Sequence, residues 1–264
     1  MTGAPIWYEL MTPDPKVVIP FYQATLGWDI GAEGMSMPNG SEYRMIDRPD
    51  GGNAGGVLTL SEGMVESGAR PGWFTYFHVD DVDATSAKAQ EMGARQWMAQ
   101  TVPGVGRMAM LSDPQGAPFY VMDPTPPPGN PDARSDVFAP KKPGHCWWNE
   151  LETTDEPEAS AFYSALFGWG TDQAMPMGDK GVYRFIEAND MGIGAINPWM
   201  ADYMTVGWLP YFGVADIDAA KAAAETSGGT ITHDVHEVPG GDFIFTATDP
   251  AGAAVGFAGP RGEV

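Results

Sequence analysis

The sequence contains a single cysteine and few basic residues, and each scarcity limits what the protein can be. Cys146 cannot form an internal disulfide, which agrees with a reducing compartment. The 264 residues include 14 Lys and Arg against 35 Asp and Glu, a formal charge of −21. This charge would repel nucleic-acid phosphates and anionic lipid surfaces. Nucleic-acid and membrane partners are therefore not expected.

Long apolar segments are also absent. No run of 18 apolar residues is present, and the first 15 residues lack the basic and continuous apolar segments of a signal peptide. We therefore predict a cytoplasmic protein. Hydrophobic residues make up 43% of the chain, enough for a buried core in each of about two domains. The acidic residues are scattered, which is typical of a solvated surface; attraction of a cationic ligand is the alternative.

The sequence does contain an internal repeat. Residues 7–28 and 148–169 align without a gap and agree at ten of 22 positions, sharing WxEL, T, D, FYxA and GW. The repeat continues through residues 43–46 and 183–186 and closes with DPxG at residues 113–116 and 249–252. Between the copies, residues 124–144 are rich in proline and polar residues, which is typical of a linker. We predict domains at residues 1–123 and 145–264, joined by this linker.

Each half itself contains two similar units. In the first unit, a strand at residues 6–11 is followed by a capping Asp14 and a helix that ends at Gly27. The second unit repeats this order with a strand at residues 74–79, Asp81 and a helix at residues 84–92. Further strand candidates follow each helix, at residues 42–47, 56–60, 95–101, 107–111 and 117–122. The chain is thus predicted to be an α+β protein of four βαβββ units.

One residue conflicts with this pattern. Pro20 falls inside the first helix, where proline removes a backbone donor and costs about 3 kcal/mol. We therefore expect the first helix to be irregular.

Tandem βαβββ units with FYxxxxGW and DPxG, each occurring twice at matched spacing, resemble the vicinal oxygen chelate superfamily. This group includes glyoxalase I, extradiol dioxygenases, fosfomycin-resistance enzymes and bleomycin-resistance proteins. The resemblance covers nearly the whole chain outside the linker. It implies two domains of glyoxalase and bleomycin-resistance type, each a curved mixed sheet around a cavity. It leaves open whether the first unit pairs with the second or with the fourth.

The resemblance also implies where a metal would bind. Metal-dependent members hold the ion with His, Gln or Glu on the first strand of each unit and on the last strand. None of the matching residues here is a suitable ligand, since carboxylate, imidazole or carbonyl groups are required. We therefore expect no protein-held divalent metal and no other cofactor. The six residues are Trp7, Phe74, Tyr120, Trp148, Leu209 and Gly256.

Strand alternation then predicts which side chains line each cavity. If Trp7 faces the cavity, Glu9 and Met11 do so as well, while Tyr8 and Leu10 face the helices. We expect ligand-binding residues in both halves, and we expect the first half to hold the working site. The predicted ligand-binding set is Trp7, Met11, Phe74, Tyr76, Tyr120, Met122, Trp148, Glu152 and Tyr211.

Three residues are candidates for catalysis. A carboxylate of Glu9 or Glu150 pointing into an aromatic cavity would be desolvated, which would raise its pKa and suit it to proton transfer. His78 could act as a base beside Glu9. The alternative is that all three make structural hydrogen bonds. His233 and His236 are three residues apart on a strand, so we expect them to face opposite sides of a solvated edge.

The function favoured by these features is binding of a small, planar or apolar organic molecule without a protein-held metal, as in bleomycin-resistance proteins. One alternative is an enzyme, either a glyoxalase-like lyase or isomerase related to lactoylglutathione lyase, or a metal-independent acid–base catalyst using Glu9. A non-catalytic scaffold is a third class. The expected partner is a small molecule, bound by a monomer or homodimer, and the identity of the ligand stays open.

Overall fold

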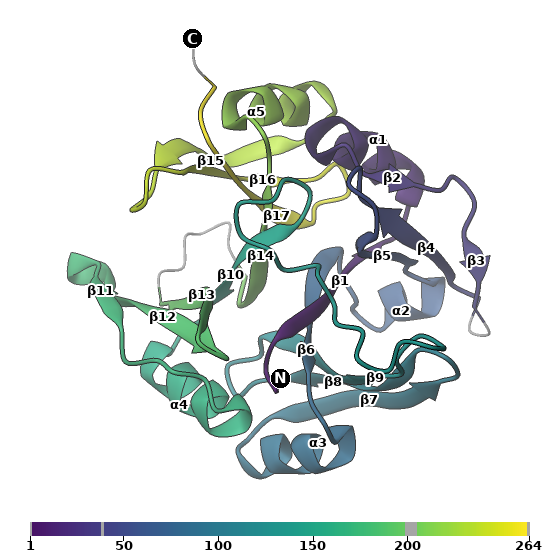
Figure 1. Cartoon of the computed structure of the whole chain (residues 1–264), viewed down its shortest axis with the longest axis vertical. Coiled ribbons are helices and arrows are strands. Elements are labelled where there is room, and N and C mark those ends of the chain that lie inside the picture. The colour runs from purple at the N-terminus through teal and green to yellow at the C-terminus, as the bar shows by residue number, and fades with distance from the viewer. Residues whose placement is uncertain (1, 38–39, 199–204, 263–264) are drawn as a thin grey trace. The chain divides into compact units, whose positions relative to one another are not determined.

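The computed structural model of the chain describes residues 2–37, 40–198 and 205–262. It contains two mixed β-sheets, of nine and eight strands, accompanied by helices (Figure 1). The predicted α+β class and the four βαβββ units are confirmed. Within the described residues, no helix is long and apolar enough to cross a membrane.

The first two repeats form the nine-stranded sheet. The first repeat contains β1 (Pro5–Thr12), α1 (Pro15–Leu26), β2 (Asp29–Ile30), β3 (Met35–Ser36), β4 (Glu42–Asp47), β5 (Asn53–Thr59) and α2 (Glu62–Glu66). The second contains β6 (Gly72–His78), α3 (Val82–Glu91), β7 (Arg95–Val102), β8 (Gly106–Ser112) and β9 (Pro118–Pro124). The strand order is β2-β4-β5-β1-β6-β9-β8-β7, and β3 pairs with β4.

The last two repeats form the eight-stranded sheet. The third repeat contains β10 (Cys146–Glu152), α4 (Glu156–Phe167), β11 (Ala174–Pro176), β12 (Val182–Ala188) and β13 (Met191–Asn197). The fourth contains β14 (Gly207–Gly213), α5 (Ile217–Thr226), β15 (Thr230–Glu237), β16 (Phe243–Thr248) and β17 (Ala254–Gly259). The strand order is β11-β12-β13-β10-β14-β17-β16-β15. In every repeat the first strand pairs in parallel with the last strand.

An aspartate begins the main helix of each repeat, as the sequence predicts. The side chains of Asp14, Asp81, Asp155 and Asp216 each accept a hydrogen bond from a backbone N–H in the first turn of the helix that follows. Gly27 ends α1 in the left-handed conformation, with φ 67°.

The expected irregularity of the first helix is wrong. Helix α1 runs unbroken from Pro15 to Leu26, with Pro20 inside it on the exposed side. The bond that Pro20 cannot make would go to Lys16, which lies in the first turn, so the helix loses one bond near its end rather than at its centre.

The helices answer the pairing question that the sequence leaves open. The chain forms two compact units, which we name by their repeats. The first–fourth unit comprises Trp7–Phe74, Val137–Trp147 and Leu209–Val264, and it holds α1 and α5. The second–third unit comprises Met1–Ile6, Thr75–Asp136 and Trp148–Trp208, and it holds α3 and α4. The helices of the first and fourth repeats thus pack together, as do those of the second and third, and we call this crosswise packing. Each sheet, in contrast, joins two consecutive repeats.

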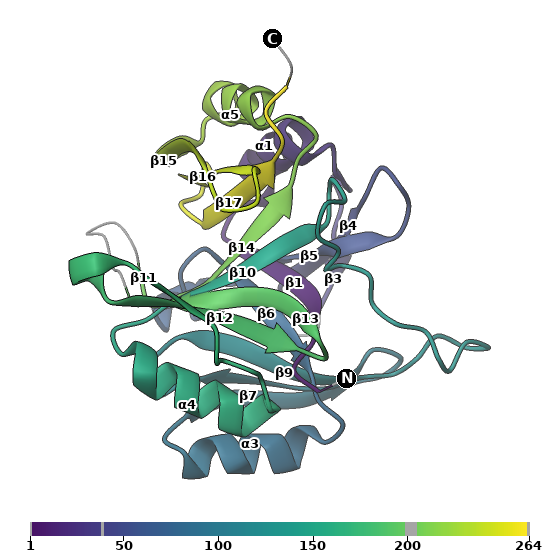
Figure 2. The same ribbon diagram turned by 60° about the vertical axis from the view of Figure 1, so that its left-hand side comes forward.

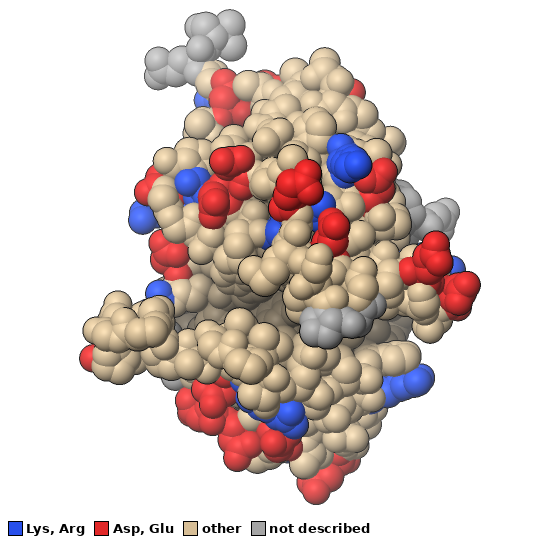
Figure 3. Space-filling model, turned by 90° about the vertical axis from the view of Figure 1, so that its right-hand side faces the viewer, with Lys and Arg blue, Asp and Glu red and all other residues tan. Residues whose placement is uncertain are grey.

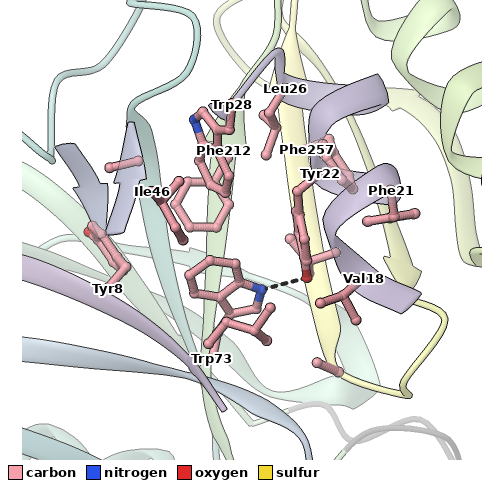
Figure 4. Close-up of a cluster of buried hydrophobic side chains, with 14 of the residues drawn as sticks. Tyr8, Val18, Phe21, Tyr22, Leu26, Trp28, Ile46, Trp73, Phe212 and Phe257 are labelled. Atoms are coloured by element: carbon pink, nitrogen blue, oxygen red, sulfur yellow. Dashed lines mark hydrogen bonds between the residues drawn. The ribbon is translucent and has the colours of Figure 1, made fainter. Parts of the chain in front are cut away.

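The core of the first–fourth unit contains a cluster of aromatic rings (Figure 4). Tyr8 and Leu10 of β1 are fully buried in it, which confirms that they face the helix side. Trp28 contacts Phe212 edge to face, with ring centroids 4.8 Å apart. The alternation of β1 therefore directs Trp7, Glu9 and Met11 to the other face of the strand.

The repeated FY and DPxG motifs make a buried hydrogen-bonded lock in each unit. Tyr22 Oη donates to Asp249 Oδ2 at 3.0 Å and accepts from Trp73 Nε1 at 2.9 Å. Tyr163 makes the same two bonds, to Asp113 and from Trp208, each at 3.1 Å. Burial raises the pKa of both aspartates. These motifs therefore recur because they hold the crosswise packing together.

The predicted linker contains irregular backbone with some tightly held residues. No helix or named strand lies between residues 125 and 145, all of which the structure describes. Val137 is buried in the core, and the buried His145 pairs with Asp50 at 2.8 Å. Division of the chain into domains at this segment stays a prediction.

Charged side chains are spread over the face of the molecule that Figure 3 shows. In the face shown in Figure 3, acidic residues lie in several separate groups among uncharged ones. This agrees with a solvated acidic surface.

Candidate functional site

Several polar side chains gather on one face of the third repeat. Helix α4 lies along the other face of β12 and β13 (Figure 2). In the parallel pairing of β10 with β13, Glu150 lies opposite Ala195 and Glu152 opposite Asn197. Ala195 also lies opposite Phe185 of β12, the strand that pairs with the other edge of β13. These residues therefore form adjoining rows on the face away from α4.

A hydrogen-bonded relay runs along this face. Trp148 Nε1 donates to Tyr183 Oη at 2.8 Å, and Tyr183 Oη donates to Glu150 Oε2 at 2.6 Å. Burial, together with the negative charge of Glu150, raises the pKa of Tyr183 well above its usual value. Tyr183 therefore keeps its proton and directs it at Glu150.

Glu152 lies next to this relay and is only 2% exposed. Asn197 Nδ2 donates to its Oε1 at 3.1 Å. Its buried Oε2 has no hydrogen-bond partner among the described residues. Burial, and then the adjacent charge of Glu150, raise the pKa of Glu152 to about 10. At neutral pH Glu152 is thus a protonated carboxylic acid beside Glu150.

Aromatic rings surround the hydroxyl group of Tyr183, which donates to Glu150. Phe185 lies 5.6 Å from Tyr183 and 6.2 Å from Trp148 between ring centroids, edge to face in both cases. Trp148 and Phe185 are half-buried. We call this set the carboxyl-pair face; its members are Trp148, Glu150, Glu152, Tyr183, Phe185 and Asn197.

The first repeat has the same Trp–Tyr bond but lacks the second carboxyl group. Trp7 Nε1 donates to Tyr43 Oη at 2.9 Å, and Glu9 is buried in the position of Glu150. The places of Glu152 and Asn197 are taken by Met11 and Leu58, which lie opposite each other in the β1–β5 register. The duplicated residues are thus Trp, Tyr and Glu, and the carboxyl pair is present in the third repeat but not in the first.

The other predicted ligand-binding residues lie on neighbouring strands. Tyr76 and Tyr120 are in register and stack on each other, with ring centroids 4.1 Å apart and an interplanar angle of 1°. His78 lies opposite Met122 in the same pairing. Phe74 is half-buried, and Tyr211 packs over Gly256, where a Cβ would overlap its ring. A ligand-binding role for these residues stays a prediction.

His78 is only partly buried. Burial is the main cause that lowers the pKa of His78 from its usual value, so the ring is neutral at neutral pH. Its Nδ1 lies 4.0 Å from the exposed Asp80. A neutral imidazole can act as a base, but a catalytic role for His78 stays a prediction.

His233 and His236 are both exposed, as expected, but the expectation that they face opposite sides is wrong. Their rings lie together, with centroids 5.2 Å apart. Register shifts on both sides of His233 in the β15–β16 pairing break the alternation on which the expectation depends.

The family-type metal positions do not fit a divalent cation. The indole Nε1 atoms of Trp7 and Trp148 donate hydrogen bonds to tyrosines and have no lone pair to offer an ion. Tyr120 is stacked on Tyr76. Across residues 2–37, 40–198 and 205–262, no group of three or more His, Cys, Asp or Glu side chains is placed to hold a metal.

Sequence reasoning missed Tyr183, Phe185 and Asn197. A signal for Tyr183 is present, because YRMI and YRFI match between the halves. Asn197 has no such signal: its role depends on the register between β10 and β13.

Two family models match the chain. A glyoxalase-like domain matches residues 7–122. The Glyoxalase/Bleomycin resistance protein/Dioxygenase superfamily matches residues 145–257. Together the two matches cover both halves of the chain.

Two kinds of curated relative are similar in sequence. "Anthracycline biosynthesis protein DnrV" of Streptomyces peucetius is 28% identical over 275 residues, covering 95% of this chain and 91% of the relative. "Putative glyoxylase CFP32" of Mycobacterium tuberculosis is 39% identical over 127 residues, covering 47% of this chain. That second match spans about half of the relative, 46% of its length.

Solved structures share the fold. The 2,3-dioxygenase LapB from Pseudomonas sp. KL28 aligns with a TM-score of 0.64 at 14% identity, covering 99% of this chain and 94% of that one. The Mn(II)-bound glyoxalase from Novosphingobium aromaticivorans aligns with a TM-score of 0.64 at 15% identity, covering 100% and 84%. At such low identity the likeness concerns the fold alone.

Proposed function

Because this chain belongs to the glyoxalase, bleomycin resistance protein and dioxygenase superfamily, with one such domain in each half, we propose that it binds a small organic molecule at the carboxyl-pair face, without a protein-held metal. The observation that carries the proposal is the meeting of two half-buried aromatic rings, Trp148 and Phe185, with the buried carboxyl groups of Glu150 and Glu152. Apolar walls with a few placed polar groups are typical of small-molecule sites.

The aromatic side chains favour a flat ligand. Ring stacking and edge-to-face contacts stabilise flat molecules by about 0.5–1.5 kcal/mol per pair beyond the area they bury. Similarity to an anthracycline biosynthesis protein over 95% of this chain supports an oxygenated polycyclic molecule. The carboxyl pair would then bind the polar substituents of that molecule.

Two features favour the third repeat over the first, although the sequence favours the first half. The third repeat has Phe185 where the first has Met45, and it has Glu152 and Asn197 where the first has Met11 and Leu58. A buried carboxyl group is expensive to desolvate, so its presence in only one copy suits a ligand rather than the fold.

Titration with 1,2-dihydroxyanthraquinone, followed by quenching of tryptophan fluorescence, tests the proposal. Phe185→Met installs the first repeat's residue and should weaken binding about tenfold, or roughly 1.4 kcal/mol. Met45→Phe, its matched control, should leave binding unchanged. Equal affinity in all three proteins would place the ligand elsewhere. Binding that EDTA dialysis abolishes and Mn²⁺ restores would contradict the metal-free part.

A glyoxalase-related lyase or isomerase is the second candidate, with "Putative glyoxylase CFP32" as the relative that supports it. The buried carboxyl pair of Glu150 and Glu152 is the structural observation in its favour, since two neighbouring carboxyl groups can act as acid and base. Turnover of methylglyoxal and glutathione that is lost in Glu150→Gln and kept in Glu9→Gln would support it.

The remaining parts of the proposal concern context. We propose a monomer or homodimer with a small-molecule partner and no nucleic-acid or membrane partner, in keeping with the charge of −21. A cytoplasmic location is in keeping with the single buried thiol.

A further inference from the structure

The carboxyl pair holds two acids and one proton in a buried place. Glu150 and Glu152 are two residues apart on β10 and are 8% and 2% exposed. Asn197 donates to Oε1 of Glu152 and Tyr183 donates to Oε2 of Glu150, while Oε2 of Glu152 is buried without a hydrogen-bond partner among the described residues. Burial and the charge of Glu150 raise the pKa of Glu152, so this carboxyl group keeps its proton at neutral pH. The pair thus carries a net charge of −1.

The fold does not require this arrangement. In the first repeat the equivalent positions hold Met11 and Leu58, an apolar pair in the same register. Replacing a buried polar group with well-packed apolar residues is often neutral or stabilising. The third repeat therefore keeps a costly second carboxyl group where its duplicate does without one.

We infer that Glu150 and Glu152 form a site for an organic ammonium group, which displaces the proton of Glu152 when it binds beside the rings of Trp148 and Phe185. This inference rests on the proposed function, because it adds a cationic amine to the ring system of that ligand. The exchange balances: the ammonium enters with one positive charge, one proton leaves to solvent, and the charge of the occupied site stays at −1.

Three further observations suit a cation. Aromatic faces attract ammonium groups through their ring electrons; Trp148 is linked to Glu150 through Tyr183, and Phe185 contacts Trp148. The basic residue of β12, Arg184, pairs with Glu156 of α4 on the opposite face. The charge of −21 raises the local concentration of cations around the protein.

The titratable groups around the pair do not compete for this role. On β12, Tyr183 keeps its proton because burial raises its pKa, and Glu187 is exposed near the end of the strand. Strand β13 carries no titratable side chain, and β14, the other neighbour of β10, carries only Tyr211.

A matched pair of fluorescent probes tests the inference. 9-(Aminomethyl)anthracene and 9-(hydroxymethyl)anthracene differ only in an ammonium against a hydroxyl group. We expect the amine to bind the wild-type protein at least tenfold more tightly. Titration calorimetry at pH 8 in phosphate and in Tris should give different heats, equivalent to release of about half to one proton. The affinity for the amine should rise with pH between 6.5 and 8.

Variants assign the proton to its residue. Glu152→Gln keeps the shape and can still donate to Glu150, but it holds no acidic proton, so proton release and the pH dependence of affinity should vanish. The double variant Glu152→Met, Asn197→Leu, which installs the first repeat's pair, should do the same. Glu9→Gln, the matched change in the first repeat, should release the wild-type number of protons.

The outcomes separate the two proposals. If both probes bind equally without proton release, the ammonium site is wrong and the proposed function stands. If neither probe binds, both are wrong. If millimolar Mg²⁺ releases the same proton and competes with the amine, the pair is a metal site instead. The proton count of the wild-type protein decides the matter even if a variant fails to fold.

Discussion

Tyr22→Phe removes one hydroxyl group from the lock of the first–fourth unit. That hydroxyl donates to Asp249 at 3.0 Å and accepts from Trp73 at 2.9 Å, and all three side chains are buried. The phenylalanine ring fills the same space, so packing changes little. The loss of stability therefore measures the two hydrogen bonds.

The expected loss follows from the groups left behind. A buried polar group without a partner costs about 1–3 kcal/mol, and the variant leaves Trp73 Nε1 and Asp249 Oδ2 in that condition. Asp249 Oδ1 keeps the backbone N–H groups of Ala251 and Ala253, so the carboxylate is not fully orphaned. We expect the free energy of unfolding to fall by about 3 kcal/mol at pH 8.

Acidification should reduce this loss. Burial already raises the pKa of Asp249, and removing a donor from its carboxylate raises that pKa further. A native state with the higher pKa gains stability as pH falls through it, so the loss should be smaller at pH 5.

Urea unfolding followed by tryptophan fluorescence measures the effect. Tyr163→Phe provides an internal replicate, because Tyr163 makes the same two bonds in the second–third unit. A loss below about 0.5 kcal/mol in both variants would refute the view that these hydroxyls hold the repeats together.

Three further predictions concern other groups. The pKa of Asp50 is lowered to about 2, mainly by its hydrogen bond with His145. Asp50→Asn should therefore lower the melting temperature fully above pH 4, and the difference from wild type should shrink as the pH falls toward 2. Glu152 affects stability in the opposite direction with pH. Because its pKa is raised, the free energy of unfolding of the wild type should fall from pH 5 to pH 9, by at most about 1.4 kcal/mol per pH unit. Glu152→Met should flatten this slope when unfolding by urea is measured across that range. Gly56→Ala should lower the melting temperature and disturb Tyr43, because a Cβ there overlaps the Tyr43 hydroxyl; a wild-type melting curve would contradict this contact.

The fold was predictable because its signals are local and duplicated. A capping aspartate such as Asp14 acts on the next turn of backbone, and the alternation of β1 alone directs Glu9 and Leu10 to opposite faces. Such features depend on neighbours within a few residues. Their recurrence in the second half then reveals the repeat.

The site was only partly predictable because it depends on long-range register. Glu150 and Glu152 follow from alternation, but Asn197 reaches Glu152 only through the pairing of β10 with β13, 45 residues away in sequence. The lock between Tyr22 and Asp249 joins residues 227 apart. A bulge on either side of His233 likewise leaves no local sign.

A crystal structure with 9-(aminomethyl)anthracene bound tests the central claim most directly. We predict that the ring system lies against Trp148 and Phe185, with the ammonium within hydrogen-bond distance of Glu150 or Glu152. Electron density for the probe on the first repeat, around Trp7 and Glu9, would contradict the claim. A metal ion held at the carboxyl-pair face would contradict it as well.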